Sequence, residues 1–248
     1  MVIPARYGST RFPAKILAGE TGKPLVQHVV DRVRLCHRVR EVLVATDDQR
    51  IIDALRPFET RCVMTSPTHQ SGTDRIAEVA RDLSDEIVVN VQGDEPEIEP
   101  AIVDALIDRL EKTPPEQMAT AATAFPADAD PSDPNLVKVV VNLEGRAIYF
   151  SRGLIPFPRD RNPFSAAGAA GPSVHYLHLG IYAYRREFLL KFAAWTPTRL
   201  EIIERLEQLR ALEHGCPIYV LKVDRAVHGI DTPEQYADFV RRTKNVKT

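Results

Sequence analysis

The feature that most constrains this chain of 248 residues is the alternation of short apolar runs with helical patterns. Four apolar runs have the length of buried strands and lie at residues 1–5, 42–46, 61–64 and 86–91. Four segments carry apolar residues at helical spacing and lie at residues 24–34, 49–55, 73–83 and 100–110. Because strands that alternate with helices form βαβ units, the sequence predicts an α/β fold with a mainly parallel sheet. Right-handed crossovers place helices on both faces of such a sheet, so we expect a three-layer sandwich.

The second half of the chain has a different texture. Its predicted strands are residues 118–125, 137–142, 147–151, 178–184 and 218–223, and its predicted helices are residues 200–213 and 233–242. Leu143-Glu144-Gly145-Arg146 has the composition of a hairpin turn, so we expect the sheet to be mixed. Residues 161–173, rich in Gly, Ala and Pro, predict a mobile surface loop. No linker divides the chain, so we expect one domain, 1–248, with halves at 1–125 and 126–248.

Composition argues against several classes of protein. The formal net charge is -2 and the basic residues are scattered, so we expect neither nucleic acid nor a membrane surface as a partner. The cysteines, Cys36, Cys62 and Cys216, are far apart and odd in number, which disfavours a disulfide framework or a thiolate metal site. No apolar run approaches the roughly 20 residues of a membrane helix. We therefore expect a cytoplasmic protein.

Polar residues follow three of the predicted strands, at positions where ligands gather in parallel sheets. The loop after the first strand contains Arg6, Gly8, Ser9, Thr10, Arg11 and Lys15. Small residues let backbone N–H groups approach an anion, and three cations can neutralise a triphosphate. The loop matches neither the Walker A pattern nor the dinucleotide-binding glycine pattern. A solvated basic loop is the alternative, and phosphate binding is the interpretation we favour.

Two aspartates are candidate metal ligands. Asp94 follows the strand at residues 86–91, and Asp231 stands before the predicted helix at residues 233–242. Carboxylate oxygens suit Mg²⁺, which commonly takes one or two protein carboxylates and completes its shell with phosphate and water. Turn formation is an alternative role for Asp94, and helix capping for Asp231. Spacing in the sequence does not decide whether the two side chains meet.

The remaining candidates have ordinary structural explanations as well. Ser71 and Thr73 stand at the start of a predicted helix, where capping alone would account for them. His178 and Tyr182 could simply alternate on a half-buried strand. Glu207 and Gln208 could face solvent on a helix whose core side is formed by Ile203, Leu206, Leu209 and Leu212. For Arg152 the residue type indicates binding instead, because a guanidinium can bind a carboxylate through two parallel hydrogen bonds.

Three segments together resemble the 3-deoxy-manno-octulosonate (Kdo) cytidylyltransferase family, also called CMP-Kdo synthetases. They are Ile-Pro-Ala-Arg-Tyr-Gly-Ser-Thr-Arg-Phe-Pro-Ala-Lys at 3–15, Val-Gln-Gly-Asp-Glu-Pro at 91–96 and His-Gly-Ile-Asp-Thr-Pro at 228–233. The resemblance covers nearly the whole chain, in family order. The sequence departs from the usual family pattern at Ala14 and Ile16, where Gly and Pro are common.

The resemblance implies a nucleotide-diphospho-sugar transferase type of fold, with a small sugar-binding and dimerisation subdomain. It implies catalytic Arg11, Lys15, Asp94 and Asp231, with Asp94 and Asp231 as ligands of Mg²⁺. It implies that CTP is bound by Arg6, Gly8, Ser9, Thr10, Ser71, Gly72, Thr73 and Gln92. It implies that the acidic sugar is bound by Arg152, His178, Tyr182, Glu207 and Gln208. It further implies a homodimer, with candidate interface strands between Val137 and Ser151, and a product used in lipopolysaccharide assembly.

Other functions fit the same sequence less well. Sibling cytidylyltransferases for 8-amino-Kdo or a sialic acid differ in sugar contacts that the sequence does not resolve. A sugar-1-phosphate nucleotidyltransferase shares the fold class, but the Tyr-Phe-Ser-Arg and Gln-Gly-Asp-Glu-Pro segments argue against it. A non-catalytic nucleotide sensor would not need two metal carboxylates, so the presence of Asp94 and Asp231 disfavours it.

Overall fold

The computed structural model describes residues 1–8, 11–126, 129–159, 174–224 and 229–245. The chain forms two compact units. Unit 1 comprises residues 1–107 and 227–248, and unit 2 comprises residues 108–226. The predicted surface loop at 161–173 and two predicted phosphate-binding residues, Ser9 and Thr10, lie outside the described residues.

Unit 1 contains a parallel sheet in the order β3-β2-β1-β4. The strands are β1 (Val2–Pro4), β2 (Leu43–Thr46), β3 (Cys62–Met64) and β4 (Ile87–Asn90). All four strands were predicted from their apolar runs, and the structure confirms them with ends shifted by one or two residues. Because they run parallel, the polar residues after β1, β2 and β4 lie at the same edge of the sheet.

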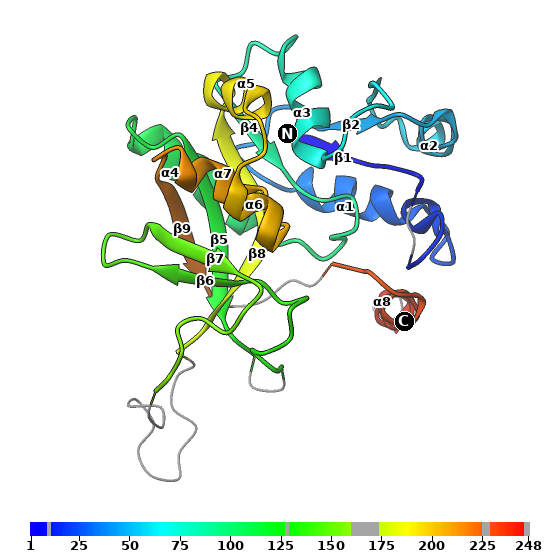
Figure 1. Ribbon diagram of the computed structural model, residues 1–248. Coiled ribbons are helices and arrows are strands. Elements are labelled where there is room, and N and C mark those ends of the chain that lie inside the picture. The colour runs from blue at the N-terminus through cyan, green and yellow to red at the C-terminus, as the bar shows by residue number, and fades with distance from the viewer. Residues whose placement is uncertain (9–10, 127–128, 160–173, 225–228, 246–248) are drawn as a thin grey trace. The chain divides into compact units, whose positions relative to one another are not determined.

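Helices lie on both faces of the unit 1 sheet, as right-handed crossovers require. The helices of unit 1 are α1 (Leu25–Val33), α2 (Gln49–Leu55), α3 (Gly72–Ala80) and α8 (Pro233–Asn245), of which α8 packs against α1. In Figure 1, α3 and α1 lie on opposite sides of β1. Helix α4 (Pro100–Lys112) carries the chain from unit 1 into unit 2. Two short 3-10 helices, η1 (Lys15–Leu17) and η2 (Arg56–Phe58), complete unit 1.

The C-terminal helix α8 is held to unit 1 by an apolar cluster. Tyr236, Phe239 and Val240 of α8 pack with Ile230 and with Leu25 of α1, and all five are buried. The Tyr236 hydroxyl also accepts a hydrogen bond from the backbone N–H of Glu20 at 2.9 Å. These contacts fix the segment just before α8, which carries Asp231, against the N-terminal part of the chain.

The described residues of unit 2 form five strands in a mixed sheet. They are β5 (Met118–Ala124), β6 (Lys138–Val141), β7 (Ala147–Ser151), β8 (Tyr176–Arg185) and β9 (Ile218–Val223). Strand β5 pairs antiparallel with β8 and parallel with β9, while β6 pairs with β7 and β8. The predicted hairpin between β6 and β7 is confirmed. Its Gly145 has a φ of 79°, and a Cβ there would lie 2.9 Å from the Tyr219 ring.

The predicted helix at residues 200–213 is wrong as a single element. The structure has α6 (Arg199–Glu204) and α7 (Gln208–Glu213), separated at Arg205, whose φ of 55° ends α6 in the left-handed region. The break turns Ile203 to solvent with 64% exposure, so its predicted place on the core side is also wrong. Helix α5 (Arg186–Ala194) follows β8 and was not predicted.

The observed elements confirm the predicted α/β class, with a parallel sheet in unit 1 and a mixed sheet in unit 2. Within the part of the chain that the structure describes, no helix combines the length and apolar character needed to cross a membrane.

Candidate active site

The two aspartates that were candidate metal ligands meet at the ammonium group of Lys15. The Lys15 nitrogen lies 2.5 Å from Oδ2 of Asp94 and 3.0 Å from Oδ1 of Asp231. An Arg11 nitrogen lies 3.1 Å from Oδ2 of Asp231. The Lys15 side chain is only 8% exposed, so its charge is compensated chiefly by these carboxylates. Residues from three distant segments thus form one compact charged cluster.

Local packing explains why the segments converge. The backbone N–H of Ile230 donates to the carbonyl of Asp94 at 2.8 Å, which joins the segment before α8 to the turn after β4. A Cβ at Gly93 would lie 3.1 Å from the Pro4 carbonyl oxygen and 3.2 Å from Cδ1 of Ile16. Glycine therefore allows the turn that carries Asp94 to press against β1 and the basic loop.

Helix α8 begins with a capping box that does not use the Asp231 carboxylate. Thr232 Oγ1 accepts from the N–H of Gln235 at 3.3 Å, and Gln235 Oε1 accepts from the N–H of Thr232 at 3.1 Å. Gln235 Oε1 also accepts from the N–H of Asp231 at 2.6 Å. The Thr-x-x-Gln spacing at 232–235 was the sequence signal for this arrangement. The carboxylate of Asp231 is consequently available to Arg11 and Lys15.

A cavity of about 630 Å³ opens beside the charged cluster. It is lined by Pro4, Arg6, Gly8, Arg11, Lys15, Ile16, Gln92, Gly93, Asp94 and Asp231. The Arg11 side chain is 60% exposed, so it can turn toward an anion. Arg6 is also exposed. The cavity therefore combines cations that suit phosphate with carboxylates that suit a divalent cation.

A smaller cavity of about 190 Å³ shares Pro4, Arg6 and Gln92 with the larger one. Its other lining residues are Ala5, His69, Gln70, Ser71, Gly72 and Arg75. Ser71 also caps α3, because its side chain accepts from the N–H of Asp74 at 3.1 Å. Thr73 is buried in α3. The predicted nucleotide residues Ser71, Gly72 and Gln92 thus lie together, although Ser71 has the capping role as well.

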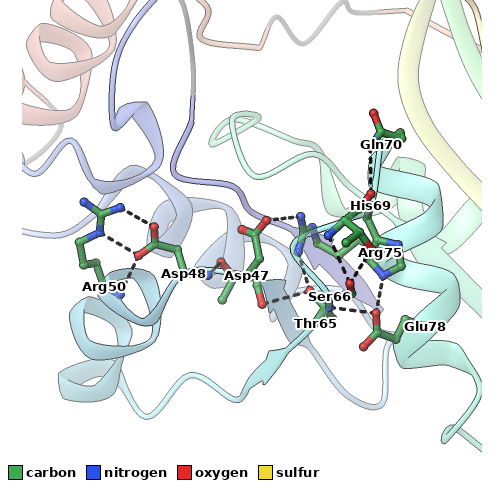
Figure 2. Close-up of polar contacts among 11 residues, drawn as sticks. Asp47, Asp48, Arg50, Thr65, Ser66, His69, Gln70, Arg75 and Glu78 are labelled. Atoms are coloured by element: carbon green, nitrogen blue, oxygen red, sulfur yellow. Dashed lines mark hydrogen bonds and ion pairs between the residues drawn. The ribbon is translucent and has the colours of Figure 1, made fainter.

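The wall of the smaller cavity is braced by Arg75, which we did not predict as a site residue. Arg75 is 5% exposed and donates to Thr65 Oγ1 at 2.5 Å and to Asp47 Oδ2 at 2.7 Å (Figure 2). These bonds connect α3 with the segments after β2 and β3. Its position at the end of the Ser-Gly-Thr-Asp-Arg segment was the available signal.

Other polar contacts in Figure 2 stabilise the same edge of the sheet. His69 pairs with Glu78, and this hydrogen bond, with a second from the Ser66 N–H, lowers the pKa of Glu78. Asp48 caps α2 by accepting from the N–H of Arg50 at 3.0 Å. The neighbouring Asp47 does not cap α2 but accepts a hydrogen bond from Arg75.

In the basic loop after β1, Ala14 has a left-handed backbone conformation. It is one of the two positions at which the sequence departs from the usual family pattern. Ala14 has a φ of 55° and precedes η1. An L-residue adopts this region at a cost, whereas glycine adopts it freely. The other departure, Ile16, is buried and lines the larger cavity. The left-handed backbone at position 14 explains why glycine is common there in the family that the sequence resembles.

In unit 2, two predicted sugar-binding residues lie side by side on β8. The rings of His178 and Tyr182 are 5.4 Å apart, and Phe150 packs edge-on to His178 at 5.0 Å. Thr120 Oγ1 lies 2.7 Å from the Ile181 carbonyl and 3.0 Å from Nε2 of His178. Since the hydroxyl has one proton to give the carbonyl, we assign the Nε2–H tautomer to His178. Desolvation lowers the pKa of His178 to about 3, so its ring is neutral with Nδ1 as an acceptor.

Arg152 has structural contacts that the sequence did not reveal. Its guanidinium donates to the carbonyl oxygens of Glu204 at 2.8 Å, Pro134 at 2.9 Å and Arg205 at 3.4 Å. Its backbone N–H donates to the Glu204 carboxylate at 2.9 Å, and Ser151 Oγ donates to the same carboxylate at 2.6 Å. These bonds tie β7 to the end of α6. Two of the five N–H groups of the half-buried guanidinium are not used in them.

Glu207 and Gln208 lie at the start of α7. Gln208 is 5% exposed, so the alternative that places it on a solvated helix face is wrong. Among the described residues, no side chain or backbone group is hydrogen-bonded to its amide. Glu207 lies 3.6 Å from Arg210, whose guanidinium is held mainly by Glu201 at 2.5 and 2.8 Å. Of the two side chains, Glu207 therefore has a charged neighbour, whereas the Gln208 amide has no hydrogen bond among the described residues.

Comparisons with known proteins point to one family. A family model described as cytidylyltransferase matches residues 1–222. A 3-deoxy-manno-octulosonate cytidylyltransferase from Geobacter sulfurreducens is 49% identical over 245 residues, which cover 98% of each chain. The protein of the same name from Geotalea uraniireducens is 48% identical over 245 residues, again covering 98% of each.

Solved structures agree with the sequence comparisons. A CMP:2-keto-3-deoxy-manno-octonic acid synthetase complexed with CTP aligns with a TM-score of 0.89 and 40% identity. The alignment covers 99% of this chain and 98% of that one. A 4-diphosphocytidyl-2C-methyl-D-erythritol synthase from Anaerococcus prevotii aligns with a TM-score of 0.59 at 16% identity, covering 100% and 95% of the two chains. The second likeness concerns the fold alone.

Proposed function

Because the chain belongs to the cytidylyltransferase family, we propose that it transfers CMP from CTP to the anomeric hydroxyl of Kdo and releases pyrophosphate. The observation that carries the proposal is the convergence of Asp94, Asp231 and Lys15 beside a cavity that also contains Arg6 and Arg11. A nucleotide triphosphate needs cations for its phosphates, and a divalent ion bound to it needs hard oxygen ligands.

The carboxylate pair fits a divalent cation, for which Mg²⁺ is our proposal. Asp94 and Asp231 both bind one cationic group, the Lys15 ammonium, so their carboxylates already converge on a shared positive charge. Within the described residues, no three His, Cys, Asp or Glu side chains gather as a metal site. Two protein carboxylates, with phosphate and water as further ligands, match the preference of Mg²⁺. When bound, Mg²⁺ would stabilise negative charge on the reacting phosphates.

The residues of unit 1 hold and orient the nucleotide. Arg6 and Arg11 neutralise the phosphates, and Lys15 turns from the carboxylates toward the leaving pyrophosphate. Gly8 brings backbone close to the anion, and Ser9 and Thr10 stay predicted phosphate-binding residues from the sequence. The smaller cavity, beside Ser71, Gly72 and Gln92, receives the cytidine half. Thr73 supports this wall from within α3.

The chemistry is a direct displacement at phosphorus. The anomeric oxygen of Kdo forms a bond to the α-phosphorus, and the bond from that phosphorus to the bridging oxygen of pyrophosphate breaks. The hydroxyl loses its proton, and pyrophosphate carries the released electron pair. No covalent intermediate on the protein is required. The contribution of the chain is therefore positioning and charge neutralisation.

Polar groups of unit 2 suit an acidic sugar. The unused N–H groups of Arg152 would bind the Kdo carboxylate. Nδ1 of neutral His178 would accept a sugar hydroxyl, and the hydroxyl of Tyr182 lies on the same strand. Glu207 and the amide of Gln208 supply further acceptors and donors at the start of α7.

We also propose a homodimer in the cytoplasm whose product serves lipopolysaccharide assembly. The support for dimerisation is the β6–β7 hairpin of unit 2, which exposes the apolar side chains of Leu143 and Ile148. Sedimentation velocity would test it: the wild-type chain should sediment as a dimer and Ile148→Glu as a monomer. Identical sedimentation of the two proteins would remove this surface from consideration.

Pyrophosphate release tests the proposed reaction. Purified protein should release pyrophosphate from CTP and Mg²⁺ when Kdo is added, and mass spectrometry should detect CMP-Kdo. Parallel reactions with 8-amino-Kdo and with a sialic acid would identify a sibling specificity. Binding of CTP with no pyrophosphate release for any of these sugars would contradict an enzymatic function.

A further inference from the structure

We propose that Gln235 is a positioning residue that keeps the carboxylate of Asp231 free to bind the divalent cation. The proposal deepens the proposed function and rests on it, because Asp231 is a ligand only if the chain is a metal-dependent cytidylyltransferase. Gln235 itself touches neither carboxylate in the hydrogen bonds of the described residues. It acts on the backbone that carries Asp231.

The contacts of Gln235 fix the two residues before α8. Its Oε1 accepts from the N–H of Asp231 at 2.6 Å and from the N–H of Thr232 at 3.1 Å. One amide oxygen therefore satisfies two backbone donors at a helix start, where donors lack partners within the helix. The same segment is held on its other side by the Ile230 N–H, which donates to the Asp94 carbonyl at 2.8 Å.

These bonds remove a competing role for Asp231. Aspartate is among the preferred residues for capping a helix, because its carboxylate accepts backbone N–H groups of the first turn. Here Gln235 and Thr232 form the cap, and the Asp231 carboxylate faces Arg11 and Lys15 instead. Without an acceptor at position 235, the open N–H groups are left to carboxylates of the same segment: that of Glu234 is already hydrogen-bonded to the Thr232 side chain, which leaves that of Asp231. Capping would then draw it away from the cation.

The position suits a mutational test because Gln235 is exposed, so its replacement leaves the apolar cluster beneath α8 intact. Gln235→Leu removes both acceptor bonds, while Gln235→Glu keeps an acceptor oxygen in the same place. The matched control is Thr232→Ala, which removes the Thr232 Oγ1 bond of the cap but leaves both bonds of Gln235 Oε1. Helix stability alone would affect the control and Gln235→Leu alike.

The experiment measures Mn²⁺ binding to the CTP-loaded protein by electron paramagnetic resonance, together with the Mg²⁺ concentration for half-maximal pyrophosphate release. We expect Gln235→Leu to weaken Mn²⁺ binding and raise the Mg²⁺ requirement by about five-fold or more, which corresponds to about 1 kcal/mol. Gln235→Glu and Thr232→Ala should stay within about two-fold of wild type. Equal effects of Thr232→Ala and Gln235→Leu, or no effect of Gln235→Leu, would overturn the proposal.

A double variant separates this inference from the function on which it rests. In an Asp231→Asn background, Gln235→Leu should change Mn²⁺ binding no further, because the ligand it positions is already lost. An additional loss in the double variant would contradict action through Asp231. If Asp231→Asn alone binds Mn²⁺ as wild type does, the metal assignment of the proposed function fails, whatever Gln235 does.

Discussion

The ammonium nitrogen of Lys15 lies 2.5 Å from Oδ2 of Asp94, although the two residues are 79 positions apart. The same nitrogen reaches Asp231 across 216 positions. Lys15 therefore compensates the negative charge of both carboxylates. The relationship gives the lysine two roles in the proposed enzyme, as counter-ion of the carboxylates and as a phosphate ligand once CTP is bound.

Lys15→Met should bind Mn²⁺ more tightly than wild type in the absence of nucleotide. The positive charge of Lys15, a few ångströms from a bound Mn²⁺, repels the ion by up to several kcal/mol in a partly screened site. Methionine removes this repulsion, so we expect the Mn²⁺ affinity to rise by about ten-fold or more. The variant should nevertheless release pyrophosphate more slowly, because a cation that faces the leaving group is lost. Electron paramagnetic resonance and initial rates provide the two measurements. Unchanged Mn²⁺ affinity would show that Lys15 does not compete for the carboxylates.

Asp94→Asn should lower kcat by about 100-fold or more while changing KM for Kdo little. The interaction it removes forms chiefly in the transition state, as charge develops on the phosphates. Steady-state kinetics at limiting Mg²⁺ is the appropriate measurement, because saturating metal could hide weakened binding. Turnover near the wild-type value under these conditions would remove Asp94 from the mechanism.

Arg152→Ala should weaken Kdo binding by about ten-fold or more and leave CTP binding unchanged. A charged hydrogen bond to a carboxylate is worth about 1.5–3 kcal/mol, which sets this scale. Because Arg152 also donates to Glu204 and Pro134, the variant should lose some thermal stability. Arg152→Lys serves as a control that retains the charge. Titrations that show equal losses for CTP and Kdo would count against the sugar-site assignment.

Ala14→Gly should stabilise the protein by about 0.5–1 kcal/mol. Alanine at a φ of 55° bears a steric cost that glycine avoids, and the greater backbone entropy of unfolded glycine offsets only part of the gain. Urea denaturation of the two proteins measures the difference. A clear loss of stability would mean that the loop does not hold position 14 in the left-handed region.

His178 should make folding stability depend on pH. Its folded pKa of about 3 lies below the unfolded value of 6.5, so the native state binds fewer protons between these limits. The stability it contributes is fully present above pH 6.5 and is lost as the pH falls toward 3. Because His178 is only partly buried, we expect roughly 1–2 kcal/mol of loss between pH 6.5 and 4.5. Urea denaturation of wild type and His178→Phe measures it, and equal pH slopes would contradict the assignment.

The spacing of apolar residues predicted most helices and strands, because each of these elements buries one face. The parallel strands of unit 1 and the edge at which Arg6, Asp94 and the residues after β2 gather followed from the βαβ pattern. The break at Arg205 could not be predicted in this way, since apolar spacing continues through it and the left-handed residue is an arginine. Next to the break, Glu204 forms hydrogen bonds with Ser151 and Arg152 of the β7 segment. These contacts join residues far apart in the chain, so local spacing does not reveal them.

The site was predicted unevenly for a similar reason. Residue types and resemblance identified Asp94 and Asp231, but their meeting at Lys15 depends on how α8 packs against unit 1. Arg75 was missed because buried arginines that brace a cavity have no local pattern of their own. The capping role of Gln235 did have a local sequence pattern, the Thr-x-x-Gln spacing. Because Thr232 and Gln235 form the cap of α8, the alternative role of the Asp231 carboxylate as a helix cap is wrong.

The central claim is that Asp94 and Asp231 bind one divalent ion beside the phosphates of CTP. Crystals of the CTP complex grown with Mn²⁺, measured at the manganese absorption edge, test it most directly. The account predicts an anomalous peak at about 2.1–2.2 Å from a carboxylate oxygen of each residue, with phosphate oxygens among the other ligands. A peak that contacts neither carboxylate, or only one of them, would contradict it.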